Sequence, residues 1–303
     1  MPMEPRGSST TASVIAPAKI NLYLHVTGRR DDGYHLLDSL VAFTDIGDVL
    51  TLAPAAAFAF SVQGQFAGAF TPKEHDSSPD SSNLVVRAAW ALSRAVVRPL
   101  QLRITLTKSL PLASGIGGGS ANAAATLRAL LSWWELSPDD VPDLRRLMSR
   151  LGADVPVCFS CQPQWAAGVG EILRPVSHLP DAPIVLVNPG KRCPTPKVFA
   201  GFNGNFAAHS GEQETIADFD GLISFLARRQ NMLTAAAGRV VPEIAIECDA
   251  LSDQPGCRLA RMSGSGATCF GLFNTHEEAA RAAKSIFAQN PHWWVRHCTL
   301  NGR

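Results

Sequence analysis

The segment over residues 111–126 constrains this chain most, because four glycines within five positions are followed at once by a run of small helix-forming residues. Glycine adopts positive φ without strain and lets a bulky anion approach the main chain. We predict a helix over residues 121–134 with Ser120 as its N-cap, so that unpaired amide N–H groups point into the loop. A glycine loop ahead of a helix N-terminus commonly binds phosphate. The alternative is a flexible turn without a ligand, although linkers rarely lead straight into a capped helix.

The same loop excludes two common nucleotide-binding motifs. A P-loop needs a lysine directly after its glycines, and this sequence has none there. The dinucleotide fingerprint needs a glycine three positions after Gly117, where this chain has Ser120. The loop therefore predicts a phosphate cradle of another lineage, neither that of the P-loop ATPases nor that of the nicotinamide dehydrogenases.

Length and charge restrict the class of ligand. The 303 residues suffice for two domains of ordinary size. With 27 basic and 26 acidic residues, the chain has no long-range field that would recruit nucleic acid or an anionic membrane. Any anion binding is therefore expected to be local.

Cysteine usage and hydropathy favour the cytoplasm. The 7 cysteines show no paired spacing beyond the single C-x-x-C of Cys158 and Cys161, so we expect neither a disulfide framework nor a zinc site. No run of 18 apolar residues is present, which predicts that nothing spans a membrane. Residues 1–13 lack the apolar stretch of a secretory signal, and we expect a frayed tail there.

The N-terminal part has the pattern of a strand. Residues 14–26 alternate around a break at Pro17, as an edge strand would. Lys19 and Asn21 lie two positions apart and therefore share one strand face. From these residues alone, that face is either the solvated side of a sheet or one wall of a site.

Periodicity predicts an alternation of strands and helices along the rest of the chain. Asp154 lies between the end of one helix and an apolar run, where a cap or turn aspartate is as good an explanation as a functional one. In the second half the order strand, helices, strand, strand, helix, strand is that of a split βαβ, ferredoxin-like layer. The expected strands are 36–45, 48–52, 53–70 in part, 100–106, 184–187, 258–262, 268–273 and 293–300; the expected helices are 83–97, 137–151, 195–199, 219–228, 232–251 and one from 275; the expected polar loops are 71–82 and 201–215.

Three separated signatures together resemble the GHMP small-molecule kinases. They are residues 17–22 (Pro-Ala-Lys-Ile-Asn-Leu), residues 111–122 with the glycine loop, and residues 263–266 (Ser-Gly-Ser-Gly). The resemblance covers residues 14–300. It implies an α+β, two-domain architecture: a ribosomal-protein-S5-like ATP domain over residues 1–167 and a ferredoxin-like domain over residues 168–303, whose last strand can pack back on the first domain.

Further signatures resemble one branch of that superfamily. They are residues 32–35 (Asp-Gly-Tyr-His), 152–156 (Gly-Ala-Asp-Val-Pro) and 194–199 (Pro-Thr-Pro-Lys-Val-Phe). Members of this branch use ATP and Mg²⁺ to phosphorylate a hydroxyl of a cytidine-diphosphate polyol in the non-mevalonate route to isoprenoid precursors. The implied partner is this small molecule, and the sequence leaves the oligomeric state open.

The resemblance also implies a role for each matching residue. Asp154 is the expected general base and Lys19 its partner. Ser120 is expected near the magnesium ion, although no acidic residue is marked as a protein ligand of the metal. The nucleotide-binding residues implied are Pro111, Leu112, Ala113, Ser114, Gly115, Ile116, Gly117, Gly118, Gly119, Ser120 and Ala121, with Asn83 and Leu84 beside the adenine. The substrate-binding residues implied are Asn21, Thr195, and Tyr34 and Phe199 around the cytosine, with His35 at its polar edge.

Two departures from the family pattern concern the glycine loop. Ala113-Ser114 and Ala121-Asn122 replace commoner pairs, but these are exchanges of small residues in a loop that binds through its backbone. Two alternatives stay open: another GHMP kinase, of homoserine or a mevalonate-like alcohol, and a non-catalytic nucleotide-binding module. The presence of both Lys19 and Asp154 speaks against the second.

Overall fold

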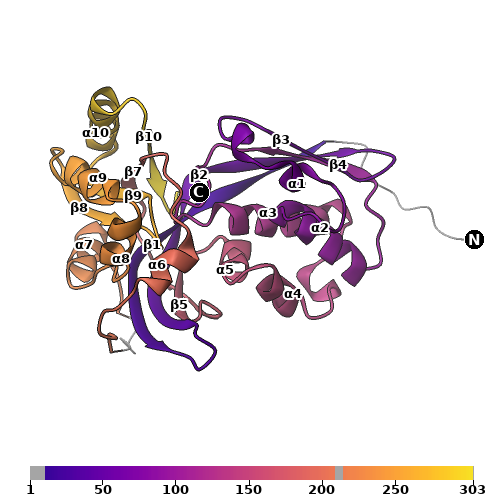
Figure 1. Ribbon diagram of the computed structural model, residues 1–303, viewed down its shortest axis with the longest axis horizontal. Helices are drawn as coiled ribbons and strands as arrows, with labels where there is room; N and C mark the ends of the chain where they lie inside the picture. The colour runs from indigo at the N-terminus through magenta and orange to yellow at the C-terminus, as the bar shows by residue number, and fades with distance from the viewer. Residues whose placement is uncertain (1–10, 209–213, 303) are drawn as a thin grey trace, which may run out of the picture. The chain divides into compact units, whose positions relative to one another are not determined.

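The structure is a computed structural model that describes residues 11–208 and 214–302 (Figure 1). Its chain forms two compact units that alternate along the sequence. The first unit holds the described residues up to Ala16, then Gly47–Leu110 and Gly119–Ser160. The second holds Pro17–Ile46, Pro111–Gly118 and the chain from Cys161 onward. The domain boundary expected near residue 167 stays a prediction, and most of the expected N-terminal tail lies outside the described residues.

The sheet of the first unit is built around β4 (Leu102–Thr107). This strand runs antiparallel to the C-terminal part of β2 (His35–Pro54) and parallel to β3 (Ala59–Gln63). Its alternate side chains are buried, Leu102 and Ile104 among them, as its alternating sequence predicts. The helices of this unit are η1 (Ala67–Ala69), α1 (Pro72–His75), α2 (Leu84–Ala95), α3 (Gly118–Trp133), η2 (Pro138–Asp140), α4 (Leu144–Leu151) and α5 (Val155–Ser160).

The second unit has an antiparallel sheet in the order β10-β7-β9-β8, with helices packed on it. Val185, Cys269 and Ile286 belong to the apolar core between this sheet and its helices. The N-terminal part of β2 pairs with β5, which pairs in turn with β6. The elements are β1 (Ala12–Arg29, which begins in the first unit), β5 (Gln164–Gly168), β6 (Ile172–Pro175), β7 (Ala182–Asn188), α6 (Thr195–Ala200), α7 (Phe219–Ala227), α8 (Thr234–Val240), α9 (Glu243–Ser252), β8 (Cys257–Met262), β9 (Cys269–Phe273), α10 (His276–Gln289) and β10 (Trp294–Leu300).

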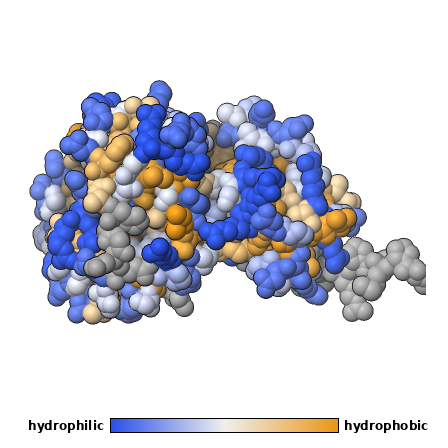
Figure 2. All heavy atoms as spheres, turned by 90° about the horizontal axis from the view of Figure 1, so that it is seen from below, coloured by the Kyte–Doolittle hydropathy of each residue, from blue (hydrophilic) through white to orange (hydrophobic). Residues whose placement is uncertain are grey.

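The predicted class and element order are confirmed: the fold is α+β, and β7, helices, β8, β9, α10 and β10 follow one another as expected for the second half. The face of the molecule in Figure 2 shows mostly hydrophilic side chains, with apolar patches between them.

Two predicted helices are interrupted by proline. The helix expected over 137–151 is the short η2 followed by α4, because Pro142 disfavours helical geometry at Val141, which is extended. The helix expected over 232–251 divides into α8 and α9 at Pro242 for the same reason, with Val241 extended.

Other differences concern strand and helix limits. β1 continues through Pro17, because a proline removes only one donor from a ladder of this length. The two strands expected over 36–45 and 48–52 are one strand, β2. Helix α3 begins at Gly118, so Ser120 lies in its first turn and is not its N-cap.

Short elements also differ from the expectation. The hairpin of β5 and β6 was not expected, and α1 interrupts the loop expected over 71–82. The capping box of Thr71 and Glu74 accounts for α1. In the loop expected over 201–215, residues 201–208 carry no helix or strand beyond the end of α6, and residues 209–213 lie outside the described part.

Candidate active site

Lys19 and Asn21 on β1 are both buried, with exposed fractions of 4% and 5%. The solvated-face alternative is therefore wrong. The backbone N–H of Lys19 donates to the carbonyl of Ile116 at 3.0 Å, which ties β1 to the glycine loop. A Cβ on Gly117 would lie 3.1 Å from the Cβ of Lys19 and 3.3 Å from its Cε. Gly117 also has a φ of +66°, which favours glycine at this position. The glycine loop therefore passes close to the Lys19 side chain, where a larger residue would clash with that side chain.

The glycine loop also contacts the loop over residues 263–266. The Ser263 hydroxyl donates to the carbonyl of Gly115 at 3.2 Å and accepts from the N–H of Asn21 at 3.1 Å. A Cβ on Gly115 would lie 2.5 Å from the Ser263 carbonyl oxygen, so this position has no room for a side chain. The N–H of Thr268 donates to the Ser114 carbonyl at 3.0 Å. Direct hydrogen bonds within the second unit thus join residues of all three predicted signatures, 17–22, 111–122 and 263–266.

The amide of Asn21 is held in one orientation. Its Nδ2 donates to Ser39 Oγ at 2.8 Å, and Ser39 Oγ donates to the carbonyl of Tyr23 at 2.5 Å. Asn21 Oδ1 is buried and has no hydrogen-bond partner among the described residues. A buried acceptor without a partner is costly unless a ligand supplies the donor. Ser39 was not predicted from the sequence, because only the pairing of β1 with β2 brings it to Asn21.

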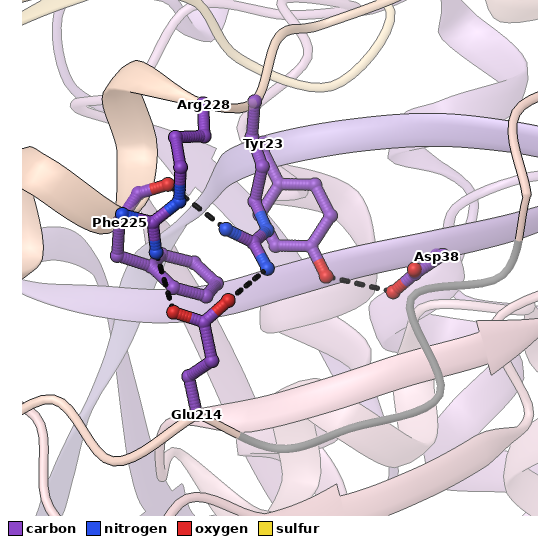
Figure 3. A network of polar contacts seen from close by, with 6 residues as sticks. Tyr23, Asp38, Glu214, Phe225 and Arg228 are labelled. Carbon is purple, nitrogen blue, oxygen red and sulfur yellow. Dashed lines mark hydrogen bonds and ion pairs between the residues drawn. The ribbon is translucent and has the colours of Figure 1, made fainter.

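The row of side chains on β1 continues into a polar network (Figure 3). The Tyr23 hydroxyl donates to Asp38 Oδ1 at 2.7 Å. Arg229 lies 3.5 Å above the centre of the Phe225 ring. Glu214 accepts from both Arg229 and Arg228 and so ties the end of the loop expected over 201–215 to the end of α7. The bond of Tyr23 to Asp38 joins β1, which also carries Asn21, to β2.

His35 and Phe199 form a stacked pair, with ring centres 5.2 Å apart and 28° between the ring planes. The pKa of His35 is lowered, first by burial and then by the nearby charge of Arg29. Tyr34 is 65% exposed, and within the described residues its ring stacks on no other ring. The sequence pairs Tyr34 with Phe199, whereas the structure places His35 on Phe199; the roles of all three in binding a base stay predictions.

Thr195 lies beside the loop over residues 263–266. Its hydroxyl is 2.7 Å from the hydroxyl of Ser265, and it is the first residue of α6. The preceding Cys193 donates its N–H to Ala113 at 3.1 Å and its thiol to the Ser265 carbonyl at 3.2 Å. Thr195 and the glycine loop therefore share one supporting loop.

Asp154, Asn83 and Leu84 belong to the first unit. Asp154 directly precedes α5, and its carbonyl accepts from the N–H of Cys158 at 3.1 Å. Asn83 is the N-cap of α2, because its Oδ1 accepts from the N–H of Val85 at 3.0 Å. Asn83 thus has a local structural task in addition to any contact with a nucleotide. The pairing of Asp154 with Lys19 stays a prediction.

Asp48 anchors the chain just ahead of the glycine loop, within the first unit. Its carboxylate is buried and pairs with the buried ammonium of Lys108 at 2.6 Å. The other carboxylate oxygen accepts from the N–H groups of Ser109 and Leu110 at 2.7 and 2.9 Å. Burial lowers the pKa of Lys108, and the attraction of Asp48 opposes that shift. Sequence reasoning gave Asp48 no role beyond that of the first residue of the strand expected over 48–52.

Within residues 11–208 and 214–302, no three His, Cys, Asp or Glu side chains gather in a way that could hold a metal ion. In the same ranges, no helix is both long and apolar enough to cross a bilayer.

Comparison with known proteins identifies two family domains. Residues 83–162 match "GHMP kinases N terminal domain" and residues 212–292 match "GHMP kinases C terminal". A 4-diphosphocytidyl-2-C-methyl-D-erythritol kinase of Paramagnetospirillum magneticum is 45% identical over 291 residues, which cover 96% of this chain and 99% of the relative. The enzyme of the same name from Paracoccus denitrificans is 49% identical over 285 residues, which cover 92% of this chain and 93% of the relative.

Solved structures agree with this grouping. A crystal structure of 4-(cytidine 5'-diphospho)-2C-methyl-D-erythritol kinase superposes with a TM-score of 0.77 at 33% identity, covering 96% of this chain and all of that one. A homoserine kinase from Cytophaga hutchinsonii superposes with a TM-score of 0.70 at 15% identity, covering 98% of this chain and 96% of that one, which is a likeness of fold alone. The fold is the two-domain GHMP kinase fold, and the protein is a small-molecule kinase. The chain belongs to the GHMP kinases and, within them, to the family of 4-diphosphocytidyl-2-C-methyl-D-erythritol kinases.

Proposed function

We propose that this protein transfers a phosphoryl group from ATP to a hydroxyl of 4-diphosphocytidyl-2-C-methyl-D-erythritol, in the non-mevalonate route to isoprenoid precursors. The observation that carries the proposal is the identity of 45% with a relative of that name over nearly the full length of both chains. The grouping of Lys19, Asn21 and the glycine loop within one unit supports it. We propose the cytoplasm as its compartment and a small molecule, not a nucleic acid, as its partner.

The glycine loop is the proposed site of the ATP phosphates. Gly115 and Gly117 have positive φ, a backbone conformation that glycine adopts without strain and that shapes the loop. The loop leads into α3 at Gly118, and the first amides of a helix attract phosphate. The nucleotide-binding residues proposed are Pro111, Leu112, Ala113, Ser114, Gly115, Ile116, Gly117, Gly118, Gly119, Ser120 and Ala121, with Asn83 and Leu84 at the adenine.

A magnesium ion is compatible with these residues if the nucleotide holds it. Magnesium in kinase sites keeps several waters and takes one or two carboxylates together with substrate phosphates, so it needs no cage of acidic side chains. Ser120, in the first turn of α3, and Asp154 are the candidates to lie near it. When bound, the ion would neutralise charge on the transferred phosphoryl group.

Asp154 is the proposed general base. Its carboxylate would accept the proton of the acceptor hydroxyl, whose oxygen attacks the γ-phosphorus while the bond to the ADP oxygen breaks. A positioned base contributes roughly 10²–10⁴ in rate. The Lys19 side chain follows Gly117, and its ammonium would stabilise negative charge on the phosphoryl oxygens. Because phosphoryl transfer depends mainly on positioning and charge, these two groups and the loop account for the step.

The acceptor is proposed to lie against Asn21 and Thr195, with its cytosine at the aromatic residues. Asn21 Oδ1 is the buried acceptor without a partner, and an alcohol supplies the donor that it lacks. The exposed Tyr34 and the pair of His35 and Phe199 offer the base ring faces, and stacking contributes about 1–3 kcal/mol per base.

The test is a coupled assay of ADP release by the full chain with the cytidyl polyol, homoserine and mevalonate as acceptors. We expect kcat/KM for the cytidyl polyol to exceed the others by several orders of magnitude. Comparable turnover of homoserine or mevalonate would indicate a different GHMP kinase. ATP binding without ADP release with any acceptor would indicate a non-catalytic module.

The Asp154→Asn variant tests the base. It should bind ATP with an unchanged Kd and lose about 10²–10⁴ of its turnover, because the amide cannot take the proton. Near-normal turnover in this variant would rule out Asp154 as the general base.

A further inference from the structure

A groove of about 560 Å³ lies in the first unit between α2 and α4. Its volume is in the range of small-molecule sites, roughly 300–1,000 Å³. None of its lining residues belongs to the glycine loop, and neither Asn83 nor Leu84 is among them. The groove is therefore separate from the residues to which the proposed kinase reaction assigns a role.

Four arginines line this groove, which we call the arginine groove. Arg87 and Arg94 lie two turns apart on α2, and Arg146 and Arg150 lie one turn apart on α4. All four are exposed. The only acidic residue of the lining, Asp143, lies 3.9 Å from Arg146.

Three of these guanidinium groups are not neutralised. Over residues 11–208 and 214–302, no side chain or carbonyl forms an ion pair or hydrogen bond with the side chains of Arg87, Arg94 or Arg150. Arg146 and Arg150 lie one turn apart on α4, and like charges at that spacing destabilise a helix. In a chain whose net charge is only +1, this local excess of positive charge attracts anions to the groove.

One lining residue of the arginine groove is aromatic. Trp90 lies on the same face of α2 as Arg87 and Arg94, and its ring is half-buried. Its Nε1 donates to the carbonyl of Ser77 at 2.9 Å, and Phe58 contacts it edge-on at 5.8 Å between ring centres. Both contacts come from residues that do not line the groove, whereas Trp90 itself does.

We propose that the arginine groove binds a nucleoside di- or triphosphate at a second site. One guanidinium group can bind two phosphate oxygens at once. Because the arginines come from both α2 and α4, they match a ligand with more than one phosphate. The indole of Trp90 provides a stacking surface for the base. An inorganic polyphosphate would satisfy the arginines alone, whereas a nucleotide also covers the ring.

Calorimetric titration of the full chain with ADP tests the proposal. We expect two binding sites in the wild type. Arg94→Glu and Arg150→Glu should each weaken one of them about tenfold or more through lost charge-assisted hydrogen bonds, and the double variant should lose it. The site that the double variant retains is the glycine loop, which the proposed function requires. If the glycine loop did not bind ADP, the double variant would show no binding at all, so the two failures can be told apart.

Arg98→Glu/Arg103→Glu is the matched control, because both residues are exposed in the same unit, lie outside the arginine groove and change the charge equally. It should keep both sites. A single wild-type site that Arg94→Glu/Arg150→Glu leaves intact, or two intact sites in that double variant, would overturn the proposal; a single site that the double variant loses would instead mean that the glycine loop does not bind ADP. If inorganic pyrophosphate binds the groove as tightly as ADP does, the proposal that the base stacks on Trp90 is wrong.

Discussion

At the scale of single residues, the proposed site depends on groups that orient others. Ser39 accepts from Asn21 Nδ2 and donates to the Tyr23 carbonyl, which leaves Asn21 Oδ1 as a buried acceptor without a partner among the described residues. We expect Ser39→Ala to lower kcat/KM for the cytidyl polyol by about three- to tenfold, the value of one hydrogen bond, because the amide can then turn over. Its KM for ATP should not change. Steady-state kinetics with both substrates measure this.

The conservative variant Ser39→Thr separates orientation from packing. It keeps the hydroxyl and should restore most of the loss seen in Ser39→Ala. If both variants match the wild type, Ser39 does not position Asn21. If both lose activity equally and melt at lower temperature, the role of Ser39 is structural.

At the scale of elements, Asp48 connects β2 with the end of β4 and the start of the glycine loop. Breaking a buried ion pair by removing one partner costs roughly 3–5 kcal/mol, because the remaining charge is left without compensation. We therefore expect Asp48→Asn to lower the free energy of unfolding by about 3 kcal/mol, with Lys108 as the unpaired group. Urea unfolding measures the change.

The double variant Asp48→Asn/Lys108→Met is the control for this prediction. Methionine removes the stranded ammonium from a site that is already buried, so most of the lost stability should return. A loss below about 0.5 kcal/mol in Asp48→Asn, the size of an ordinary surface change, would contradict the anchoring role.

The elements also show how far sequence reasoning reaches. The strand of residues 102–107, the glycine loop and the helix after it were predictable, since local patterns determine them. The breaks at Pro142 and Pro242 follow from a local rule that the periodicity concealed. Ser39, Asp48 and the arginine groove could not be predicted, because each depends on residues brought together from distant parts of the sequence.

At the scale of the whole molecule, one buried carboxyl group links stability to pH. Glu247 on α9 is fully buried, and neither of its carboxyl oxygens has a hydrogen-bond partner among the described residues. Burial, then the neighbouring Cys248, raises its pKa to about 10, while the thiol of Cys269 acts in the opposite direction. The folded protein therefore holds a proton on Glu247 at neutral pH, which the unfolded chain releases above its ordinary pKa of 4.5.

The sign follows from this difference in bound protons. Between pH 4.5 and pH 10 the folded state binds more protons than the unfolded state, so the free energy of unfolding falls as pH rises. The slope from this group is about 1.4 kcal/mol per pH unit. Glu247→Gln carries no charge in either state and should remove that slope, so its stability advantage over the wild type should grow from pH 5 to pH 8.

Urea unfolding of both proteins at several pH values measures the effect. Glu277→Gln is the matched control, because Glu277 on α10 belongs to the same unit, is exposed and is not among the groups that raise the pKa of Glu247. Its stability should follow that of the wild type across the same range. Parallel curves of unfolding free energy against pH for Glu247→Gln and the wild type would show that Glu247 is ionised in the folded protein. The ionised carboxylate would then need a partner near α9, which the described residues do not provide.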